Sequence, residues 1–163
     1  MKFLVLLLVI SLSPVSFAQT LATDHFYIGG GISRNDVGNG FDEATGFQIF
    51  IGYEFDESVV AAPFRLAAEV GYLDSGDFDI EIAGVERDRG SAKGLWGNAV
   101  GTYNINDNVA LLARAGIDIG DDDGLMAGIG GQFEFNDAIG IRVEYVIRDE
   151  IDSLQLNGVY YFE

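Results

Sequence analysis

The chain of 163 residues contains no cysteine, one histidine, one tryptophan and two prolines. Without cysteine it has no disulfide framework, no thiol chemistry and no acylated N-terminal cysteine. Basic residues are also scarce, because nine lysines and arginines stand against 26 aspartates and glutamates, a formal net charge of −17. A chain this acidic repels phosphates, so nucleic acid is excluded as a partner.

Long hydrophobic runs are missing as well, apart from one at the N-terminus that is too short for a spanning helix of about 20 residues. Lys2 precedes this run, residues 3–10, and small residues follow it up to Ala18. The pattern predicts a secretory signal peptide over residues 1–18, cut after Ala18, and one mature domain over residues 19–163. Loss of Lys2 takes the formal charge from −17 to −18.

Hydrophobic residues make up 48% of the chain, which excludes a disordered protein. Residues 139–148 (IGIRVEYVIR) show how they are arranged. Aliphatic residues and Tyr145 occupy the odd positions, whereas Arg142, Glu144 and Arg148 lie at even positions. Alternation with period two is typical of a β-strand, whose successive side chains point to opposite faces.

Eight segments alternate in this way, and no helical spacing of apolar residues is evident after the N-terminal run. They cover residues 25–33, 46–55, 63–73, 93–104, 109–119, 124–135, 138–148 and 153–162. Most exceed the roughly five or six residues of soluble strands and match the ~9–11 residues of a tilted membrane strand. The sequence therefore predicts an all-β fold, an eight-stranded antiparallel up-and-down transmembrane β-barrel.

The connections between these segments alternate in length. Residues 34–45 and 74–90 are long and polar, whereas residues 105–108 and 136–137 are tight turns. Bacterial outer-membrane barrels have short periplasmic turns and longer loops on the cell surface. We therefore expect the two long connections at the surface and the N-terminus in the periplasm. The acidity of the second connection favours contact with divalent cations or basic partners.

One face of the eight segments carries no charged residue, which predicts a lipid-facing exterior. Aromatic residues cluster at both ends of this face, with aliphatic residues, glycine and alanine between them. Such girdles lie at the two membrane interfaces of outer-membrane barrels. The predicted girdle comprises Phe26, Phe55, Phe64, Tyr103, Phe135 and Phe162 at the turn end, and Phe47, Tyr72 and Tyr145 at the loop end.

The opposite face carries charges of both signs well inside the segments. Eight strands enclose an interior just wide enough for side chains to fill, and charges buried there need partners. Five acids facing three arginines fit that requirement. The predicted polar network of the lumen comprises Glu54, Arg65, Glu69, Arg114, Asp118, Glu134, Arg142 and Glu144.

Three stretches resemble a known family: residues 26–33 (FYIGGGIS), 47–55 (FQIFIGYEF) and 154–162 (LQLNGVYYF). They are similar to the small outer-membrane β-barrel proteins of Gram-negative bacteria, such as the transmembrane domain of OmpA and OmpX. The resemblance implies a place in the outer membrane, contact with its lipids and lipopolysaccharide, and insertion by the barrel-assembly machinery. Family members typically end in an aromatic residue, and here Phe162 is followed by Glu163.

Barrels of this size also include lipid A deacylases and acyltransferases, which use a histidine with a serine. The single histidine, His25, has no serine beside it in sequence, so the nucleophile-and-base pattern is missing. Three consecutive aspartates in residues 120–124 (GDDDG) lack the alternate spacing of a calcium loop, and we interpret them as a solvated turn. We therefore expect no catalytic residue, no cofactor and no metal site.

The sequence favours a plugged polar lumen and a structural or surface-interaction role, with no surface partner identified. A narrow ion channel gated by the lumen salt bridges is the first alternative. A soluble periplasmic binding barrel of the lipocalin type is the second, and it would need an apolar lumen with a polar exterior.

Overall fold

A computed structural model describes residues 25–36, 43–82, 85–121, 123–149 and 151–162. The predicted signal peptide, residues 1–18, lies outside the described residues. None of the helical segments within the described ranges has the length and apolarity needed to cross a membrane.

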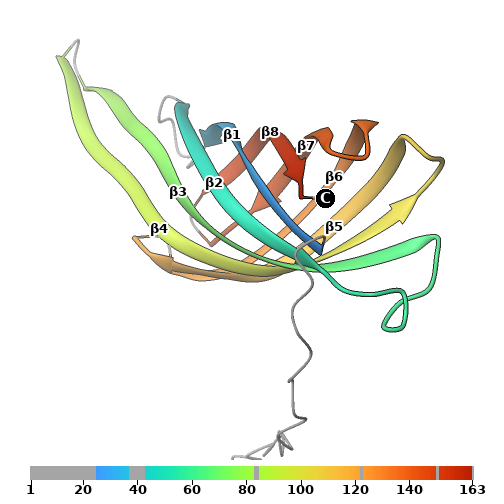
Figure 1. Cartoon of the computed structure of the whole chain (residues 1–163). Helices are drawn as coiled ribbons and strands as arrows, with labels where there is room; N and C mark the ends of the chain where they lie inside the picture. The colour runs from blue at the N-terminus through green and yellow to red at the C-terminus, as the bar shows by residue number, and fades with distance from the viewer. Residues whose placement is uncertain (1–24, 37–42, 83–84, 122, 150, 163) are drawn as a thin grey trace, which may run out of the picture.

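Eight antiparallel strands close into one barrel in simple sequence order, and β1 pairs with β8 (Figure 1). The strands are β1 (Phe26–Asp36), β2 (Ala44–Glu54), β3 (Phe64–Ile82), β4 (Val85–Asn104), β5 (Val109–Gly120), β6 (Gly124–Asn136), β7 (Ile139–Ile147) and β8 (Asp152–Tyr161). The ends of the predicted segments agree with the ends of the strands to within three residues, except where β3 and β4 extend into the connection between them. The predicted fold class, an eight-stranded antiparallel up-and-down barrel, is confirmed.

Alternation along each strand separates a lumen from an exterior. In β7, the even-numbered residues Gly140, Arg142, Glu144 and Val146 are buried, whereas the odd-numbered residues are exposed. The aliphatic side of residues 139–147 is therefore the outside of the barrel. Because side chains alternate with period two on all strands, the parity that faces outward fixes the direction of every side chain in the wall.

The connection predicted at residues 74–90 is wrong in form, because β3 and β4 continue into it. Their pairing runs from Phe64↔Tyr103 to Ile82↔Val85, so the ends of the two strands project beyond the barrel as a ribbon (Figure 1). Residues 77–82 alternate acidic and apolar side chains with the period of a strand, and the acidity of the stretch led to its interpretation as a loop. Similarly, β1 and β2 take the first three and last two residues of the connection predicted at 34–45.

A β-bulge marks the point where the ribbon leaves the barrel, between Asp74 and Asp77 in the pairing with β4. Gly76 adopts φ +75° there, and a Cβ on it would collide with the carbonyl oxygen of Thr45. The hydroxyl of the buried Ser75 accepts a hydrogen bond from the backbone N–H of Ala92 (2.8 Å). Bulges bend a strand and end its pairing on one side, which is their effect here.

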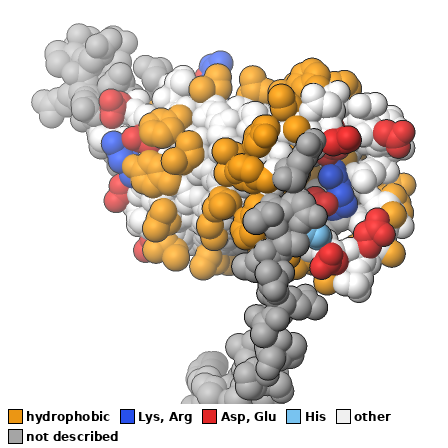
Figure 2. Space-filling model, viewed as in Figure 1, with side chains coloured by type: hydrophobic (Ala, Val, Ile, Leu, Met, Phe, Trp, Pro, Cys, Tyr) orange, Lys and Arg blue, Asp and Glu red, His pale blue; other side chains and the backbone are white. Residues whose placement is uncertain are grey.

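The exterior is an apolar band bounded by charge at the two ends of the barrel (Figure 2). We call the end that carries the β2–β3, β4–β5 and β6–β7 turns the turn rim, and the opposite end the loop rim. Between the rims, outward positions of the described strands carry no charged side chain. At the loop rim, charges return in the ion pairs Arg34–Glu43 and Asp74–Lys93.

All nine predicted girdle residues lie on outward positions. Most are exposed, whereas Phe26, Phe55 and Tyr72 are half-buried by neighbouring side chains. The rings near the turn rim pack in pairs, and three further outward aromatics take part that the predicted girdle omitted. The pairs are Phe26–Tyr53, Tyr53–Phe55, Phe64–Tyr103, Phe133–Phe135 and Tyr160–Phe162.

Candidate functional site in the barrel lumen

A cluster of four charged side chains occupies the middle of the lumen. Glu69 on β3 accepts hydrogen bonds from Arg114 on β5 and from Arg142 on β7, each over 2.6 Å. Glu144 on β7 lies 2.9 Å from the Nε of Arg114 and 3.8 Å from Arg142. The side chains of Glu69, Arg114 and Glu144 have 0% exposure and that of Arg142 has 2%. Two acids and two arginines therefore neutralise one another where water is excluded.

Neutral groups complete the coordination of the two carboxylates. The hydroxyl of Tyr27 donates to Glu69 Oε1 over 2.7 Å, and the amide of Asn157 donates to Glu144 over 3.3 Å. Asn157 also accepts from the amide of Gln48 over 2.9 Å. Burying a charge costs several kcal/mol unless it is paired and hydrogen-bonded. Glu69 meets both conditions, whereas Glu144 Oε2 has Arg114 beside it without a hydrogen bond.

Aromatic rings pack against the guanidinium groups of the two arginines. The guanidinium of Arg114 lies 5.1 Å from the ring centre of Trp96. That of Arg142 lies 5.6 Å from Phe50 and 5.8 Å from Tyr27. A cation over the face of an aromatic ring is attracted by its quadrupole, more strongly when water is excluded.

Glycines on the neighbouring strands make room for these rings. Gly29 pairs with Phe50, Gly52 with Tyr27, and Gly71 with Trp96. A Cβ at any of the three would lie 2.1 to 2.4 Å from an atom of the ring it faces. Inward glycines therefore let large rings lie flat across a narrow lumen.

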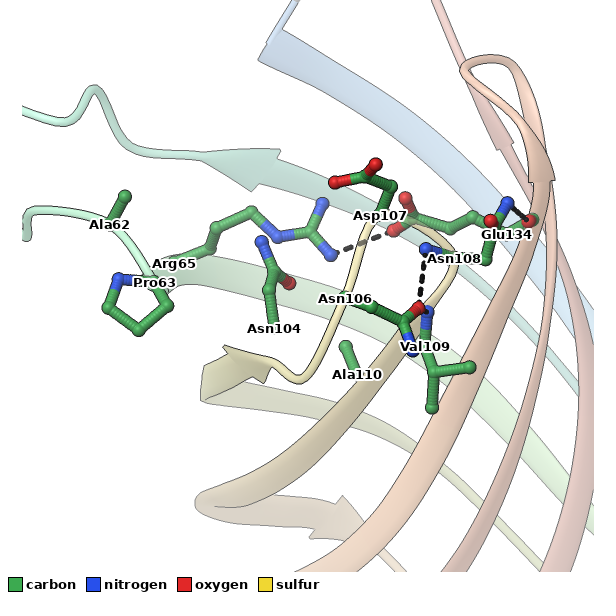
Figure 3. Close-up of a pocket in the computed structure, with 10 residues that line it drawn as sticks. All are labelled: Ala62, Pro63, Arg65, Asn104, Asn106, Asp107, Asn108, Val109, Ala110 and Glu134. Atoms are coloured by element: carbon green, nitrogen blue, oxygen red, sulfur yellow. Dashed lines mark hydrogen bonds and ion pairs between the residues drawn. The ribbon is translucent and has the colours of Figure 1, made fainter.

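A second charged cluster lies at the turn rim, in a mouth of about 290 Å³ (Figure 3). Arg65 on β3 reaches across this mouth to Glu134 on β6, over 2.7 Å, and lies 3.6 Å from Glu54 on β2. Asp107 and Asn104 also line the mouth. The charged side chains are partly exposed here, so water can share their solvation.

Gln132 on β6 joins the two clusters. Its oxygen accepts from Arg142 Nε over 3.1 Å, and its nitrogen donates to Glu134 over 2.6 Å and to the hydroxyl of Tyr161 over 2.8 Å. The central and turn-rim groups are thus one hydrogen-bonded chain. An uncharged amide carries this link, and charge counting alone gave no reason to single it out.

Asp118 pairs with an arginine outside the predicted network. It lies 3.2 Å from the Nε of Arg148, a buried arginine that the predicted network omitted. Arg148 also donates to Ser153, whose hydroxyl donates to Asn35, so a separate cluster closes the lumen near the loop rim. The inward parity of Arg148 in residues 139–148 was the sequence feature that pointed to it.

The lumen face also carries apolar residues, which share the interior with the charged clusters. Buried apolar side chains fill the space beside the charged clusters and pack against the aromatic rings. They include Phe50, Ala67, Leu73, Trp96, Val100, Leu112, Met126, Val146 and Val159. The interior therefore resembles a small protein core with charged pairs in it, because a barrel this narrow is filled by side chains.

The residues considered for chemistry lie elsewhere. His25 lies at the turn rim, where its Nδ1 is 2.8 Å from the carbonyl oxygen of Glu54 and its Nε2 is 3.4 Å from Asp56. In the aspartate-rich turn, Asp121 and Asp123 accept hydrogen bonds from the backbone N–H groups of Lys93 and Gly120. Within the described ranges, no group of three or more histidines and acids is placed to hold a metal ion.

Solved structures share this fold at low sequence identity. A designed transmembrane β-barrel aligns with 15% identity and a TM-score of 0.59, over 86% of this chain and 98% of its own. The attachment invasion locus protein Ail of Yersinia pestis aligns with 19% identity and a TM-score of 0.54, over 83% and 95%. The outer membrane enzyme PagL aligns with 14% identity and a TM-score of 0.56, over 83% and 99%. At such identities the likeness shows the fold alone.

No curated protein sequence matches the chain. A family model described as the outer membrane protein beta-barrel domain matches residues 4–160, which is nearly the whole chain. The apolar exterior, the closed eight-stranded wall and the side-chain-filled lumen agree with that match. The chain therefore belongs to the outer membrane protein β-barrel domain family.

Proposed function

We propose that this outer-membrane barrel is a non-enzymatic structural and surface-interaction protein whose lumen is plugged by its own side chains. The observation that carries the proposal is the central cluster, in which Glu69 is held between Arg114 and Arg142 with no access to water. A conducting pore needs a continuous aqueous path. These side chains occupy the middle of the lumen between the two rims.

Opening the plug would be costly. Separating Arg142 from Glu69 without a new partner leaves a buried charge, which costs about 3–5 kcal/mol in comparable cases. Thermal motion rarely supplies that much, since 1.4 kcal/mol already corresponds to a tenfold change in population. The wild-type barrel is therefore closed nearly all of the time.

The projecting ribbon of β3 and β4 supports a role at the surface. It extends beyond the barrel on the loop rim, and its sequence is acidic, with Asp77, Asp79, Glu81, Glu86 and Asp88. In the expected orientation, with the N-terminus in the periplasm, the ribbon faces outward. Its charge suits divalent cations near lipopolysaccharide or a basic partner.

An enzymatic role lacks a matching pair of groups. His25 is the single histidine, and it lies at the turn rim beside Glu54 and Asp56. The serines that line the described lumen, such as Ser33 and Ser153, belong to the loop-rim cluster at the other end of the barrel. Ser58 lies in the β2–β3 turn near Asp56, but the hydrogen bond and ion pair of His25 are with the Glu54 carbonyl and with Asp56. A nucleophile and its base must lie within hydrogen-bond reach, and no described serine has that contact with His25.

Recordings in planar lipid bilayers test the plug. We expect wild-type protein to be silent and Arg142→Ala to show small, unsteady currents, because Glu69 and Glu144 lose a shared partner and admit water. Ile141→Leu, one residue away on the lipid side, is the matched control and should stay silent. Large, steady currents from the wild type would overturn the plug and favour the channel.

The channel is the second candidate because some buried polar atoms in the lumen are unpaired. Gln48 Oε1, Asn98 Oδ1 and Gln155 Nε2 have no hydrogen-bond partner among the described residues. In that reading the salt bridges are a gate between the turn-rim mouth and these polar atoms. Voltage-dependent currents in the wild type that become steady and voltage-independent on Arg65→Ala and Arg142→Ala would support it.

Orientation and export need their own measurement. We expect the mature protein, beginning near Gln19, in the outer-membrane fraction after insertion by the barrel-assembly machinery. An epitope tag at position 80 should be labelled on intact cells. Labelling only after lysis would reverse the orientation, and recovery without detergent would favour a soluble binder of the lipocalin type.

A further inference from the structure

The apolar exterior is hollowed on one side of the barrel. A groove of about 790 Å³ crosses β1 to β5 and has almost purely apolar walls. Its outward lining residues include Ile49, Val70, Leu95, Gly97, Ile117 and Ile119. The groove lies on the membrane-facing surface, so its natural contents are apolar chains.

The absence of a side chain at Gly97 produces the hollow. Gly97 lies between Val70 on β3 and Ile117 on β5, each of which presents an exposed branched side chain. A Cβ at Gly97 would approach no atom closer than 3.8 Å, so the close packing of neighbours does not require glycine there. In the next row toward the turn rim, Ala68 pairs with Ala99 and Ala99 with Ala115, which extends the shallow path.

Charge lies immediately beyond the groove on the loop-rim side. Along β4, Lys93 is the next outward residue after Leu95, and Asp74 pairs with it in the sheet. The ammonium of Lys93 lies 2.9 Å from Asp74, and 49% of its side chain is exposed. An ammonium has three N–H donors, so Lys93 can contact a phosphate while it keeps Asp74.

We propose that this groove is a binding site for a membrane lipid with several acyl chains and a phosphate headgroup of net negative charge. The chains lie over Gly97 between the walls of Val70 and Ile117, and the phosphate contacts Lys93. The groove spans five strands, which is wide enough for chains side by side. The lipid lies in the outer leaflet if the loop rim faces outward, and this placement rests on the orientation given in the proposed function.

A second copy of the chain fits less well. Two concave faces related by a two-fold axis leave a void between them, and voids forfeit the contacts that stabilise an interface. Acyl chains are slender and flexible, and they adapt to a shallow groove. Lys93 can also contact the headgroup of a lipid, whereas a dimer held by apolar contacts would give this ammonium no partner.

Native mass spectrometry of the purified full-length protein in a neutral detergent tests the proposal. The probe is lipid A, which has several acyl chains and phosphates, with dioleoylphosphatidylcholine as the comparison lipid. Gly97→Leu fills the groove. Gly101→Leu is the matched control, since it lies on the same strand and face, and its Cβ would also meet open space. Lys93→Gln removes the ammonium.

We expect one tightly held lipid A on the wild type and on Gly101→Leu, and about tenfold weaker retention on Gly97→Leu. Lys93→Gln should weaken retention several-fold and remove its salt dependence. Equal retention by Gly97→Leu, equal retention of phosphatidylcholine by the wild type, or a dimer abolished by Gly97→Leu would each overturn the lipid site. Lipid binding is measured in detergent, so a negative result would contradict the lipid site without contradicting the plug or the orientation, which the bilayer recordings and the surface labelling test.

Discussion

The inner and outer faces of the same strands follow different rules. On β7, Arg142 has three polar partners at defined distances, whereas its neighbour Ile141 meets only apolar surroundings. On β1, Tyr27 lies across Gly52 and donates to Glu69, whereas Ile28 is exposed. The inner face depends on which side chain meets which, and the outer face depends on apolar character and height.

The solvent explains this difference. Hydrocarbon chains are interchangeable and have no directional needs, so any apolar side chain of suitable size serves on the outside. The lumen is a closed volume in which charges need partners and rings need space. Substitutions should therefore differ sharply in effect between adjacent residues of one strand.

The largest expected effect is that of Arg142→Ala. The change leaves Glu69 and Glu144 with one shared arginine, and the free energy of unfolding should fall by about 3–5 kcal/mol. Urea unfolding in lipid vesicles, followed by the heat-modifiable gel mobility of the folded barrel, measures it. A loss below about 1 kcal/mol would place this pair among ordinary surface ion pairs.

A charge placed on the outer face should cost slightly less. Ile129 lies near the middle of β6 and is 68% exposed to the membrane. Ile129→Arg should lower the free energy of unfolding by about 2–4 kcal/mol, the depth-dependent cost of arginine at the midplane. Ile129→Leu is the control, and the same unfolding assay applies. An unchanged stability for Ile129→Arg would mean that this wall does not face lipid.

Overpacking the lumen comes next. A Cβ at Gly52 would lie 2.1 Å from the ring of Tyr27, which is held in place by its hydrogen bond to Glu69. Gly52→Ala should cost about 1–3 kcal/mol. Gly158→Ala, whose Cβ would face outward with nothing closer than 3.9 Å, should be neutral. Equal effects at the two glycines would show that ring packing does not limit the lumen.

The turn-rim pair should matter less than the central one. Arg65 and Glu134 are 23% and 22% exposed, so water can solvate whichever group is left. Arg65→Ala should cost on the order of 1 kcal/mol, and the cost should shrink in high salt. Unfolding at two salt concentrations tests this, with Arg142→Ala as the salt-insensitive comparison.

The smallest effect is expected for Ile141→Leu. Both side chains are apolar and of the same size, and the site faces the membrane. Its free energy of unfolding should stay within about 0.5 kcal/mol of the wild type. A larger loss would indicate a specific contact at this point of the outer wall.

Alternation made most of the fold predictable, because a strand between two solvents must alternate. In the ribbon the alternation of residues 77–82 was present, but their acidity favoured the interpretation of a loop, and only the pairing of β3 with β4 shows the strand. Parity also placed the predicted charged residues on the lumen side without showing their partners. Asp118 pairs with Arg148, and the uncharged Gln132 joins the central cluster to Arg65 through Glu134, which no spacing along the chain indicates.

The sequence by itself determined the strand number, the order of the strands and the face that meets lipid, since these follow from period two and from short connections. Only the tertiary structure decided which charges meet, because Glu69, Arg114 and Arg142 come from strands far apart in sequence. It also decided where the exterior is hollow. That feature depends on the register that places Gly97 between Val70 and Ile117, and register is set by the closed hydrogen-bonded ladder rather than by any one strand.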